Sequence, residues 1–393
     1  MNSLDKSVHL NYPGIRMLSK NPTISVIIPV LSINSFITEE NLPALSAQRY
    51  KNLEVIVLPN LASPQDENLR SQYPFLRIQP TPGVSRPAEK RNIGARVAKG
   101  EILAFLDDDA YPTTHWLEHA VPLFTKKMSA VVCGPGLTPP NATRLERVFE
   151  AVLTSKLGSG GIQFRFTPSP SRFVDDYPSM NFLIRKEIFN QVGGFELDYW
   201  PGEDSKLSEG VVHKLKQRMY YSPDVLVYHH RRPSLKSFLK QHAQYGMHRG
   251  AFFGHGDRNS TRLSYLIPTF FTVYLFGLIL SGLAILALRY PVRLEFIIFS
   301  CVPLILYILW QLITTLMTLK KSRNLIVTTL TPMIIFSMHL TYGVAFIKGL
   351  FRRKKLYGTA PKILRAGFKG SPGRFSRARE KISIRRGNTN PNH

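Results

Sequence analysis

The sequence predicts an α/β domain with a mainly parallel, doubly wound sheet, followed by an α-helical membrane region. Short β-branched runs alternate with helical stretches over the first two-thirds of the chain, and three long apolar runs without Lys, Arg, Asp or Glu follow. Strand, helix and strand in this order place parallel strands side by side and cover the sheet with helices. Sheets of this kind bind ligands at the carboxyl ends of their strands.

Changes in composition divide the 393 residues into four parts. We expect an N-terminal extension at 1–22, the α/β domain at 23–250, membrane helices within 251–350 and a basic tail at 351–393. Hydrophobic residues make up 44% of the chain, which is enough for a sizeable core and excludes a chain that is disordered throughout.

The elements of the α/β domain follow from local patterns. Residues 24–30 form a β-branched run bounded by Pro22 and Pro29, which is typical of a buried strand. In chain order we expect the strand 24–30, the helix 39–48, the strands 53–58 and 76–78, the helix 88–99 and the strands 102–106, 131–134 and 182–185.

Each of the three apolar runs is long enough to cross the roughly 30 Å hydrocarbon core of a bilayer as a helix. They occupy residues 263–288, 296–319 and 325–347, and the third carries Pro332 and His339, which are costly in lipid. If all three crossed, the basic clusters before and after the third run would lie on opposite sides, against the positive-inside tendency. We favour two spans and a third helix that is interfacial or re-entrant.

The net charge of +25 is concentrated near the C-terminus, where 14 Lys and Arg from Lys348 onward face the single acid Glu380. A basic tail without a folded recognition motif gives only salt-sensitive attraction to nucleic acid. Next to membrane helices, anionic lipid is the simpler partner. We therefore expect the tail to bind anionic membrane lipids, and we expect no nucleic-acid partner.

The cellular location is indicated by cysteine usage and by the first residues. Cys133 and Cys301 lie in different kinds of segment and imply no disulfide framework. The first 23 residues lack an apolar stretch of signal-peptide length. We expect a multi-pass protein of the inner or plasma membrane with its α/β domain in the cytosol.

Three consecutive aspartates follow the strand expected at 102–106. Asp107, Asp108 and Asp109 repel one another unless a cation offsets their charge. Carboxylate oxygens suit Mg²⁺ or Mn²⁺, which bridge protein carboxylates to substrate phosphates. Because side chains alternate along an extended chain, Asp107 and Asp109 point the same way. We expect these two to bind the metal; an acidic helix-capping loop is the alternative.

Several segments in a fixed order together resemble the family-2 glycosyltransferases. They are residues 24–30, 89–95, 100–109, 192–195 and 202–204. The resemblance implies a GT-A fold, which is Rossmann-like with a mainly parallel sheet, and a nucleotide-sugar donor. It assigns Asp107 and Asp109 to the metal and diphosphate. It also makes Asp204 the general base that deprotonates the acceptor hydroxyl, with inversion at the anomeric carbon.

The predicted donor-binding residues lie at strand ends and in the segments that carry the resemblance. They are Pro29, Asn60, Arg91, Asp107, Asp108, Glu203 and Arg249. Asn60 stands where the family commonly has an acidic residue, which leaves the recognised base open. Solvated surface charge is an equal alternative for Arg91, and contact with lipid headgroups is an equal alternative for Arg249.

Two further patterns have structural alternatives. Glu203 and Asp204 are also suited to capping a helix over 206–217. The adjacent His229 and His230 suggest zinc, but neither a Cys nor a third well-spaced His completes such a site.

The combined prediction is a metal-dependent, membrane-bound glycosyltransferase that moves a sugar to a lipid-linked or membrane-associated glycan acceptor. Envelope or exopolysaccharide biosynthesis is the setting this favours. A polyprenyl-phosphate sugar transferase and a processive polysaccharide synthase are alternatives within the enzyme class. A non-catalytic membrane scaffold, for which Asp107, Asp109 and Asp204 would be dispensable, is the alternative outside it.

Overall fold

A computed structural model describes residues 17–199 and 201–352 of the chain. The basic tail expected to bind anionic lipid lies outside the described residues from position 353 onward.

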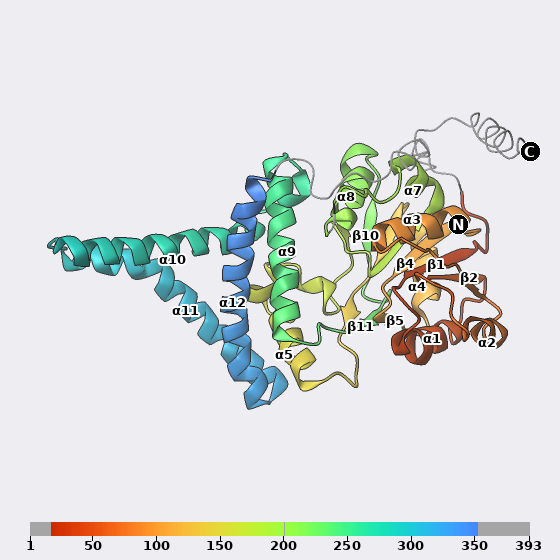
Figure 1. Cartoon of the computed structure of the whole chain (residues 1–393), viewed down its shortest axis with the longest axis horizontal. Coiled ribbons are helices and arrows are strands. Elements are labelled where there is room, and N and C mark those ends of the chain that lie inside the picture. The colour runs from red at the N-terminus through yellow and green to blue at the C-terminus, as the bar shows by residue number, and fades with distance from the viewer. Residues whose placement is uncertain (1–16, 200, 353–393) are drawn as a thin grey trace, which may run out of the picture. The chain divides into compact units, whose positions relative to one another are not determined.

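The α/β domain is built on an eight-stranded sheet with the order β3-β2-β1-β4-β9-β6-β10-β8 (Figure 1). Its strands are β1 (Ile24–Pro29), β2 (Leu53–Leu58), β3 (Leu76–Ile78), β4 (Ile102–Leu106), β6 (Val131–Cys133), β8 (Arg172–Val174), β9 (Asn181–Arg185) and β10 (Met219–Tyr221). β3, β2, β1 and β4 are parallel neighbours, whereas β9 pairs antiparallel with both β4 and β6. The predicted α/β class with a mainly parallel sheet is confirmed.

Alternate residues of the central strands supply two separate cores, one on each face of the sheet. In β4, Ile102, Ala104 and Leu106 belong to one core, and Leu103 and Phe105 belong to the other. The continuous apolar run in the sequence therefore reflects a strand buried on both sides.

The helices of the α/β domain cover both faces of this sheet. The α-helices are α1 (Leu42–Ser46), α2 (Asp66–Gln72), α3 (Pro87–Val97), α4 (Trp116–Lys126), α5 (Arg144–Thr154), α6 (Lys156–Ser159), α7 (Lys186–Val192) and α8 (Glu203–Glu209). Short π- and 3₁₀-helices are η1 (Phe36–Asn41), η2 (Gln163–Arg165), η3 (Gly210–Lys214) and η4 (Arg258–Ser260). The helix expected at 39–48 thus begins earlier, as η1, and ends at Ser46.

A second, three-stranded sheet lies next to the aspartates. It consists of β5 (Ala110–Pro112), β11 (Val227–His229) and β7 (Gly136–Leu137), in the order β5-β11-β7. Neither β5 nor β11 was expected from the sequence, because strands of three residues leave almost no periodic signal. The antiparallel pairing of β5 with β11 places His229 opposite Ala110, directly after the aspartates.

The long helix α9 (Leu235–Gly254) lies side by side with α12 (Leu325–Leu350), as Figure 1 shows. A Cβ atom at Gly246 would lie 2.3 Å from the Tyr342 carbonyl oxygen, and one at Gly250 would lie 2.1 Å from the Phe346 carbonyl oxygen. Glycines spaced four residues apart therefore let the two helix backbones touch, as small residues do in membrane-helix pairs. The boundary expected after residue 250 falls inside α9.

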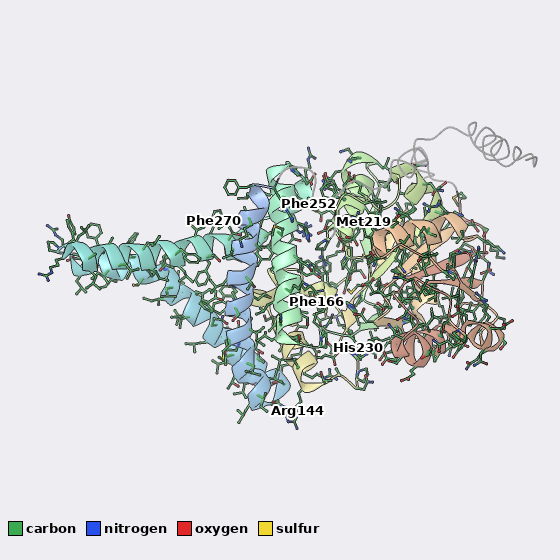
Figure 2. The ribbon with its side chains drawn as sticks, in the orientation of Figure 1. Arg144, Phe166, Met219, His230, Phe252 and Phe270 are labelled. Atoms are coloured by element: carbon green, nitrogen blue, oxygen red, sulfur yellow. The ribbon has the colours of Figure 1, made fainter. Side chains whose placement is uncertain are left out.

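In the described part of the chain, three helices are long and apolar enough to cross a membrane: α10 (Leu263–Leu288), α11 (Leu294–Ser322) and α12. α10 and α11 expose apolar side chains such as Phe270 (Figure 2), which suits contact with lipid.

The third apolar run differs from the other two because one face of α12 is buried. Val327, Ile335 and Phe346 are buried on that face, whereas Met333 and Phe336 are exposed. α12 is one continuous helix of 26 residues, which favours an interfacial or spanning helix over a re-entrant one. A helix that packs on the α/β domain along one face and shows an apolar second face fits the interfacial alternative, which stays a prediction.

Candidate functional site

The aspartates lie where β4 ends and β5 begins, at the carboxyl end of the parallel strands. A carboxylate oxygen of Asp107, a carboxylate oxygen of Asp109 and a ring nitrogen of His229 lie within 4.8 Å of one another. The Nε2 atom of His229 is 3.1 Å from an oxygen of Asp109, and its Nδ1 atom is buried without a partner in the described residues. Sequence reasoning missed His229 as a member of this group, because only the pairing of β11 with β5 brings it there.

These three side chains fit a divalent cation. The site offers two carboxylates and one imidazole as metal ligands. The carboxylates suit Mg²⁺ and Mn²⁺, and the imidazole favours a transition metal. Although burial opposes ionisation of Asp109, His229 and Arg232 lower the pKa of this carboxyl to about 2. Asp109 is therefore an anion, as a metal ligand must be.

Arg91 connects the aspartates to the acidic pair on α8. From its position on α3, its guanidinium donates to Asp107 Oδ1 at 2.5 Å and to Glu203 Oε1 at 3.2 Å. The arginine is buried against the ring of Phe195. Surface charge is therefore excluded as the role of Arg91, whose terminal nitrogens hold two carboxylates of the site in place.

Asp108 faces a different partner from its two neighbours. It accepts a hydrogen bond of 2.9 Å from Asn34 Nδ2, in the loop before η1. Burial, followed by repulsion from Asp109, raises the pKa of Asp108 to about 6. Asn34 thus ties the loop after β1 to the aspartate segment.

Lys90 joins the carboxyl ends of β1 and β2. Its ammonium group donates to the carbonyl oxygens of Val30 and Leu58 at 2.6 and 2.9 Å and to Asn60 Oδ1 at 2.5 Å. Burial lowers the pKa of Lys90 to about 8, against the attraction of Asp108. These bonds fix Asn60, and the end of β1 at Pro29, at the same sheet edge as the aspartates. The Asn60 amide oxygen accepts from Lys90.

Glu203 and Asp204 are the first two residues of α8, directly after Gly202 with a φ of 120°. Asp204 accepts from the adjacent Ser205 amide at 2.7 Å, and α8 has no side-chain cap of the usual kind. Burial and the charge of Asp176 raise the pKa of Asp204, and burial and Asp204 raise the pKa of Glu203 to about 7. A raised pKa makes Asp204 a stronger base than an exposed aspartate.

Arg249 lies apart from the metal-type group. Its guanidinium forms an ion pair with Asp176 and donates to the Asn259 carbonyl oxygen at 3.1 Å and to Ser260 Oγ at 3.3 Å. It is buried, which does not fit the headgroup-contact alternative. Arg249 acts electrostatically on Asp204, and it is not among the side chains grouped with Asp107 and Asp109.

Arg232 is the arginine beside the aspartates, and sequence reasoning did not single it out. Its Nη1 atom lies 3.9 Å from Asp109 Oδ2, and its side chain is partly exposed. With the Gln241 amide turned to satisfy its neighbours, the Gln241 oxygen accepts from Arg232 Nη2 at 3.0 Å and from the Tyr245 hydroxyl at 3.1 Å. α9 therefore presents Gln241 and Tyr245 to the same site.

His230 fastens the segment after β11. Its ring nitrogens lie 2.9 Å from Glu146 Oε1 and 3.0 Å from Glu40 Oε2, and its amide donates to the Asp109 carbonyl oxygen at 3.0 Å. η1 and the first turn of α5 are thereby tied to the strand that carries His229. The zinc alternative for the His229–His230 pair has no support, because the two rings have different partners.

Comparisons with known proteins point to one class of enzyme. Residues 25–193 match the family model described as glycosyl transferase family 2. The chain is 24% identical over 341 residues to a dolichyl N-acetyl-alpha-D-glucosaminyl phosphate 3-beta-D-2,3-diacetamido-2,3-dideoxy-beta-D-glucuronosyltransferase of Methanococcus voltae, covering 84% of this chain and 97% of that protein. It is 30% identical over 160 residues to a pre-mycofactocin glycosyltransferase of Mycobacterium tuberculosis, covering 41% of this chain and 33% of that protein.

A solved structure supports the fold. The mannosyltransferase PcManGT from Pyrobaculum calidifontis, in complex with GDP-Man and Mn²⁺, superposes with a TM-score of 0.53 at 18% identity. The match covers 84% of this chain and 88% of that one, so it extends beyond the α/β domain into the helical region.

Proposed function

We propose that this chain, a family-2 glycosyltransferase, transfers a sugar from a nucleotide-sugar donor to a lipid-linked or membrane-associated glycan acceptor. It has three long apolar C-terminal helices in its described part. The observation that carries this proposal is the continuous set of contacts from Asp109 and His229 to Asp107, Arg91 and Glu203, next to Asp204. Such a set combines a site for a metal-bound diphosphate with a base for the acceptor.

The donor lies across the carboxyl ends of β1, β2 and β4. Asn60 and Pro29 line the end nearest the nucleotide, where the Asn60 amide nitrogen can donate to a base edge. Asp107, Asp109 and His229 would hold a divalent cation, and the imidazole favours Mn²⁺. When bound, the cation would neutralise the diphosphate. Arg232, whose partly exposed guanidinium lies beside Asp109, contacts the same diphosphate in a bidentate manner.

Asp204 performs the proton transfer. An acceptor hydroxyl oxygen attacks the anomeric carbon from the face opposite the leaving group, and its proton passes to the Asp204 carboxylate. The bond between the anomeric carbon and the diphosphate oxygen breaks, which inverts the configuration. Arg91 holds the carboxylates of Asp107 and Glu203 in place during this step through its hydrogen bonds to both. We therefore assign Arg91 a positioning role rather than a contact with the nucleotide.

The membrane helices determine where the acceptor is met. α10 and α11 expose apolar faces, and α9, which carries Gln241 and Tyr245, packs on α12. The Methanococcus relative, which this chain matches over nearly its full length, is named for a dolichyl-phosphate sugar acceptor. We place this enzyme in the assembly of a surface glycan, within an envelope or exopolysaccharide, with its α/β domain on the cytosolic side of the cell membrane.

The test compares sugar transfer and donor binding by the full chain in detergent. UDP, GDP and dTDP sugars are offered with Mn²⁺ or Mg²⁺ to the wild type, Asp204→Asn and Asp109→Asn. We expect one donor to be used, and we expect Asp204→Asn to lower kcat by about 10²- to 10⁴-fold while donor binding persists. Asp109→Asn is expected to lose metal-dependent donor binding. A wild type that binds none of the donors would instead support the non-catalytic scaffold.

A further inference from the structure

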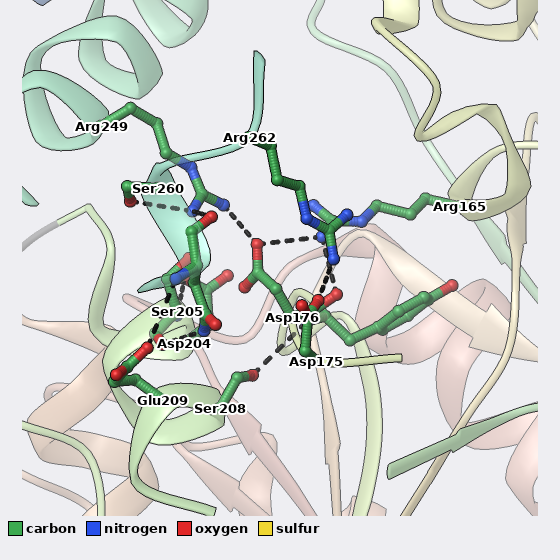
Figure 3. Close-up of polar contacts among 12 residues, drawn as sticks. Arg165, Asp175, Asp176, Asp204, Ser205, Ser208, Glu209, Arg249, Ser260 and Arg262 are labelled. Carbon is green, nitrogen blue, oxygen red and sulfur yellow. Dashed lines mark hydrogen bonds and ion pairs between the residues drawn. The ribbon is translucent and has the colours of Figure 1, made fainter. Parts of the chain in front are cut away.

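A cluster of charged side chains lies between the catalytic base and the start of the membrane helices. Figure 3 shows Arg165, Arg249 and Arg262 converging on Asp175 and Asp176. Arg165 Nη2 donates to the Asp176 carbonyl oxygen at 2.8 Å and to its carboxylate at 3.1 Å, and Arg249 forms an ion pair with the same carboxylate. Arg262 pairs with Asp175 at the partly exposed rim.

In the buried part of this cluster two arginines pair with one aspartate, and Asp204 is the next carboxylate that acts on them. Arg165, Arg249 and Asp176 are all buried, and the two guanidinium groups share one carboxylate. Burial opposes ionisation of Asp176, but the charges of Arg249 and Arg165 hold the pKa of this carboxyl well below its usual value. One carboxylate cannot fill every donor position of two guanidinium forks.

The same junction contains polar atoms that are buried without partners in the described chain. They are Arg165 Nε and the Tyr265 and Tyr342 hydroxyls. Tyr265 acts electrostatically on both arginines, and Tyr342 acts on Arg249 and Tyr265, so these groups are neighbours. The Arg249 guanidinium lies 4.5 Å from the centre of the Tyr265 ring.

The chemistry of these atoms specifies the missing partner. An arginine Nε–H only donates, and a tyrosine hydroxyl beside a cation is best satisfied by donating. Leaving such groups unpaired in a buried site is unfavourable, so a group rich in acceptor oxygens and carrying negative charge fits them. A phosphate ester has both properties.

We propose that this junction binds the phosphate of the lipid-linked acceptor, whose oxygens accept from Arg165, Tyr265 and Tyr342. The inference rests on the proposed function and deepens it by naming the acceptor chemistry. Tyr265 and Thr269 lie in the first turns of α10, whose N-terminal end favours an anion and whose exposed apolar face suits the attached hydrocarbon chain.

The position next to Asp204 gives this site a function in catalysis. Arg165, Arg249 and Asp176 all act electrostatically on Asp204. A phosphate held at the junction therefore leaves the sugar that is linked to it beside the base. Binding the phosphate orients the acceptor hydroxyl, and the phosphate takes no part in bond formation.

The experiment measures binding of geranyl phosphate and of geraniol to the full chain in an uncharged detergent. We expect geranyl phosphate to bind at least about tenfold more tightly than geraniol. The double variant Tyr265→Phe with Tyr342→Phe, which removes only two hydroxyls, is expected to lose that advantage while geraniol binding stays the same. Tyr274→Phe is the matched control. Tyr274 also lies on α10, but its hydroxyl donates to the Ser300 carbonyl oxygen, away from the junction.

Three results would overturn the inference. Equal affinity for geranyl phosphate and geraniol, or unchanged phosphate binding in the double variant, would leave the unpaired hydroxyls as structural groups or water sites. Competition by inorganic phosphate at the same concentration as geranyl phosphate would show that a free anion, and not a lipid phosphate, is bound. Donor binding is measured on the same samples. Absence of donor binding in the wild type argues against the proposed function, whereas a wild type that binds the donor but does not prefer geranyl phosphate to geraniol argues only against this site.

Discussion

At the scale of single residues, each carboxylate of the site has a defined partner. Arg91 bonds to Asp107 and Glu203, Asn34 bonds to Asp108, and His229 lies against Asp109. The consecutive aspartates could be read from the sequence, because three adjacent charges after a buried strand have few structural explanations. The partners come from segments far away in the chain, and no local pattern reveals them.

His229 provides the residue-scale prediction. Replacing His229 with Ala removes the nitrogen ligand and leaves two carboxylates, so the apparent Kd for Mn²⁺ in the presence of the donor nucleotide should rise at least about tenfold. Electron paramagnetic resonance of free Mn²⁺ measures this without turnover. His119→Ala, on the surface of α4, is the control and should bind as the wild type does. Unchanged Mn²⁺ binding in His229→Ala would remove His229 from the metal site.

At the scale of elements, α9 links the site to the membrane helices. One part of this helix presents Gln241 and Tyr245 to the site, and another carries Arg249, while Gly246 and Gly250 contact the backbone of α12. The sequence placed this segment at the end of a domain. It is instead shared by the α/β domain and the helical region, because glycines allow it to pack against α12 over its whole length.

Matched glycine substitutions test this packing. Gly250→Ala puts a methyl group 2.1 Å from the Phe346 carbonyl oxygen, which forces α9 and α12 apart and should lower the free energy of unfolding by about 1–3 kcal/mol. Gly282→Ala, in α10, meets no atom within 4 Å and should be neutral or stabilising by up to about 1 kcal/mol. Thermal unfolding in detergent compares the two, and equal midpoints would mean that the α9–α12 contact is loose.

At the scale of the whole molecule, α12 differs from α10 and α11. α12 packs against α9 and α5 of the α/β domain, whereas α10 and α11 keep apolar faces exposed. An arrangement with two spans and one interfacial helix keeps the basic residues after α11 and those after α12 on the same side as the α/β domain. It satisfies the positive-inside tendency that three spans would violate.

Cysteine labelling in sealed, oriented vesicles tests the arrangement. With Cys301→Ser as background, single Tyr290→Cys, Ser322→Cys and Lys348→Cys variants are exposed to a membrane-impermeant thiol reagent. We expect Ser322→Cys and Lys348→Cys to react from the face that carries the α/β domain and Tyr290→Cys to react from the opposite face. Reaction of Lys348→Cys from the opposite face would show that α12 spans the bilayer.

The sequence by itself determined the features that depend on local pattern. The buried strands such as 102–106, the apolar helices and the acidic residues at 107–109 and 203–204 all follow from runs of similar side chains, whose physical preferences act over a few residues. The order of strands and helices was enough for the mainly parallel α/β sheet.

Only the tertiary structure decided which of these residues meet. Strands β5 and β11 are too short to predict, yet their pairing brings His229 to Asp109. In the sequence, Arg91 and Arg249 are both cations expected near the site. In the folded chain Arg91 pairs with Asp107 and Glu203, whereas Arg249 pairs with Asp176. Long-range contacts between charged groups depend on where whole elements pack, and no pattern within one segment records that.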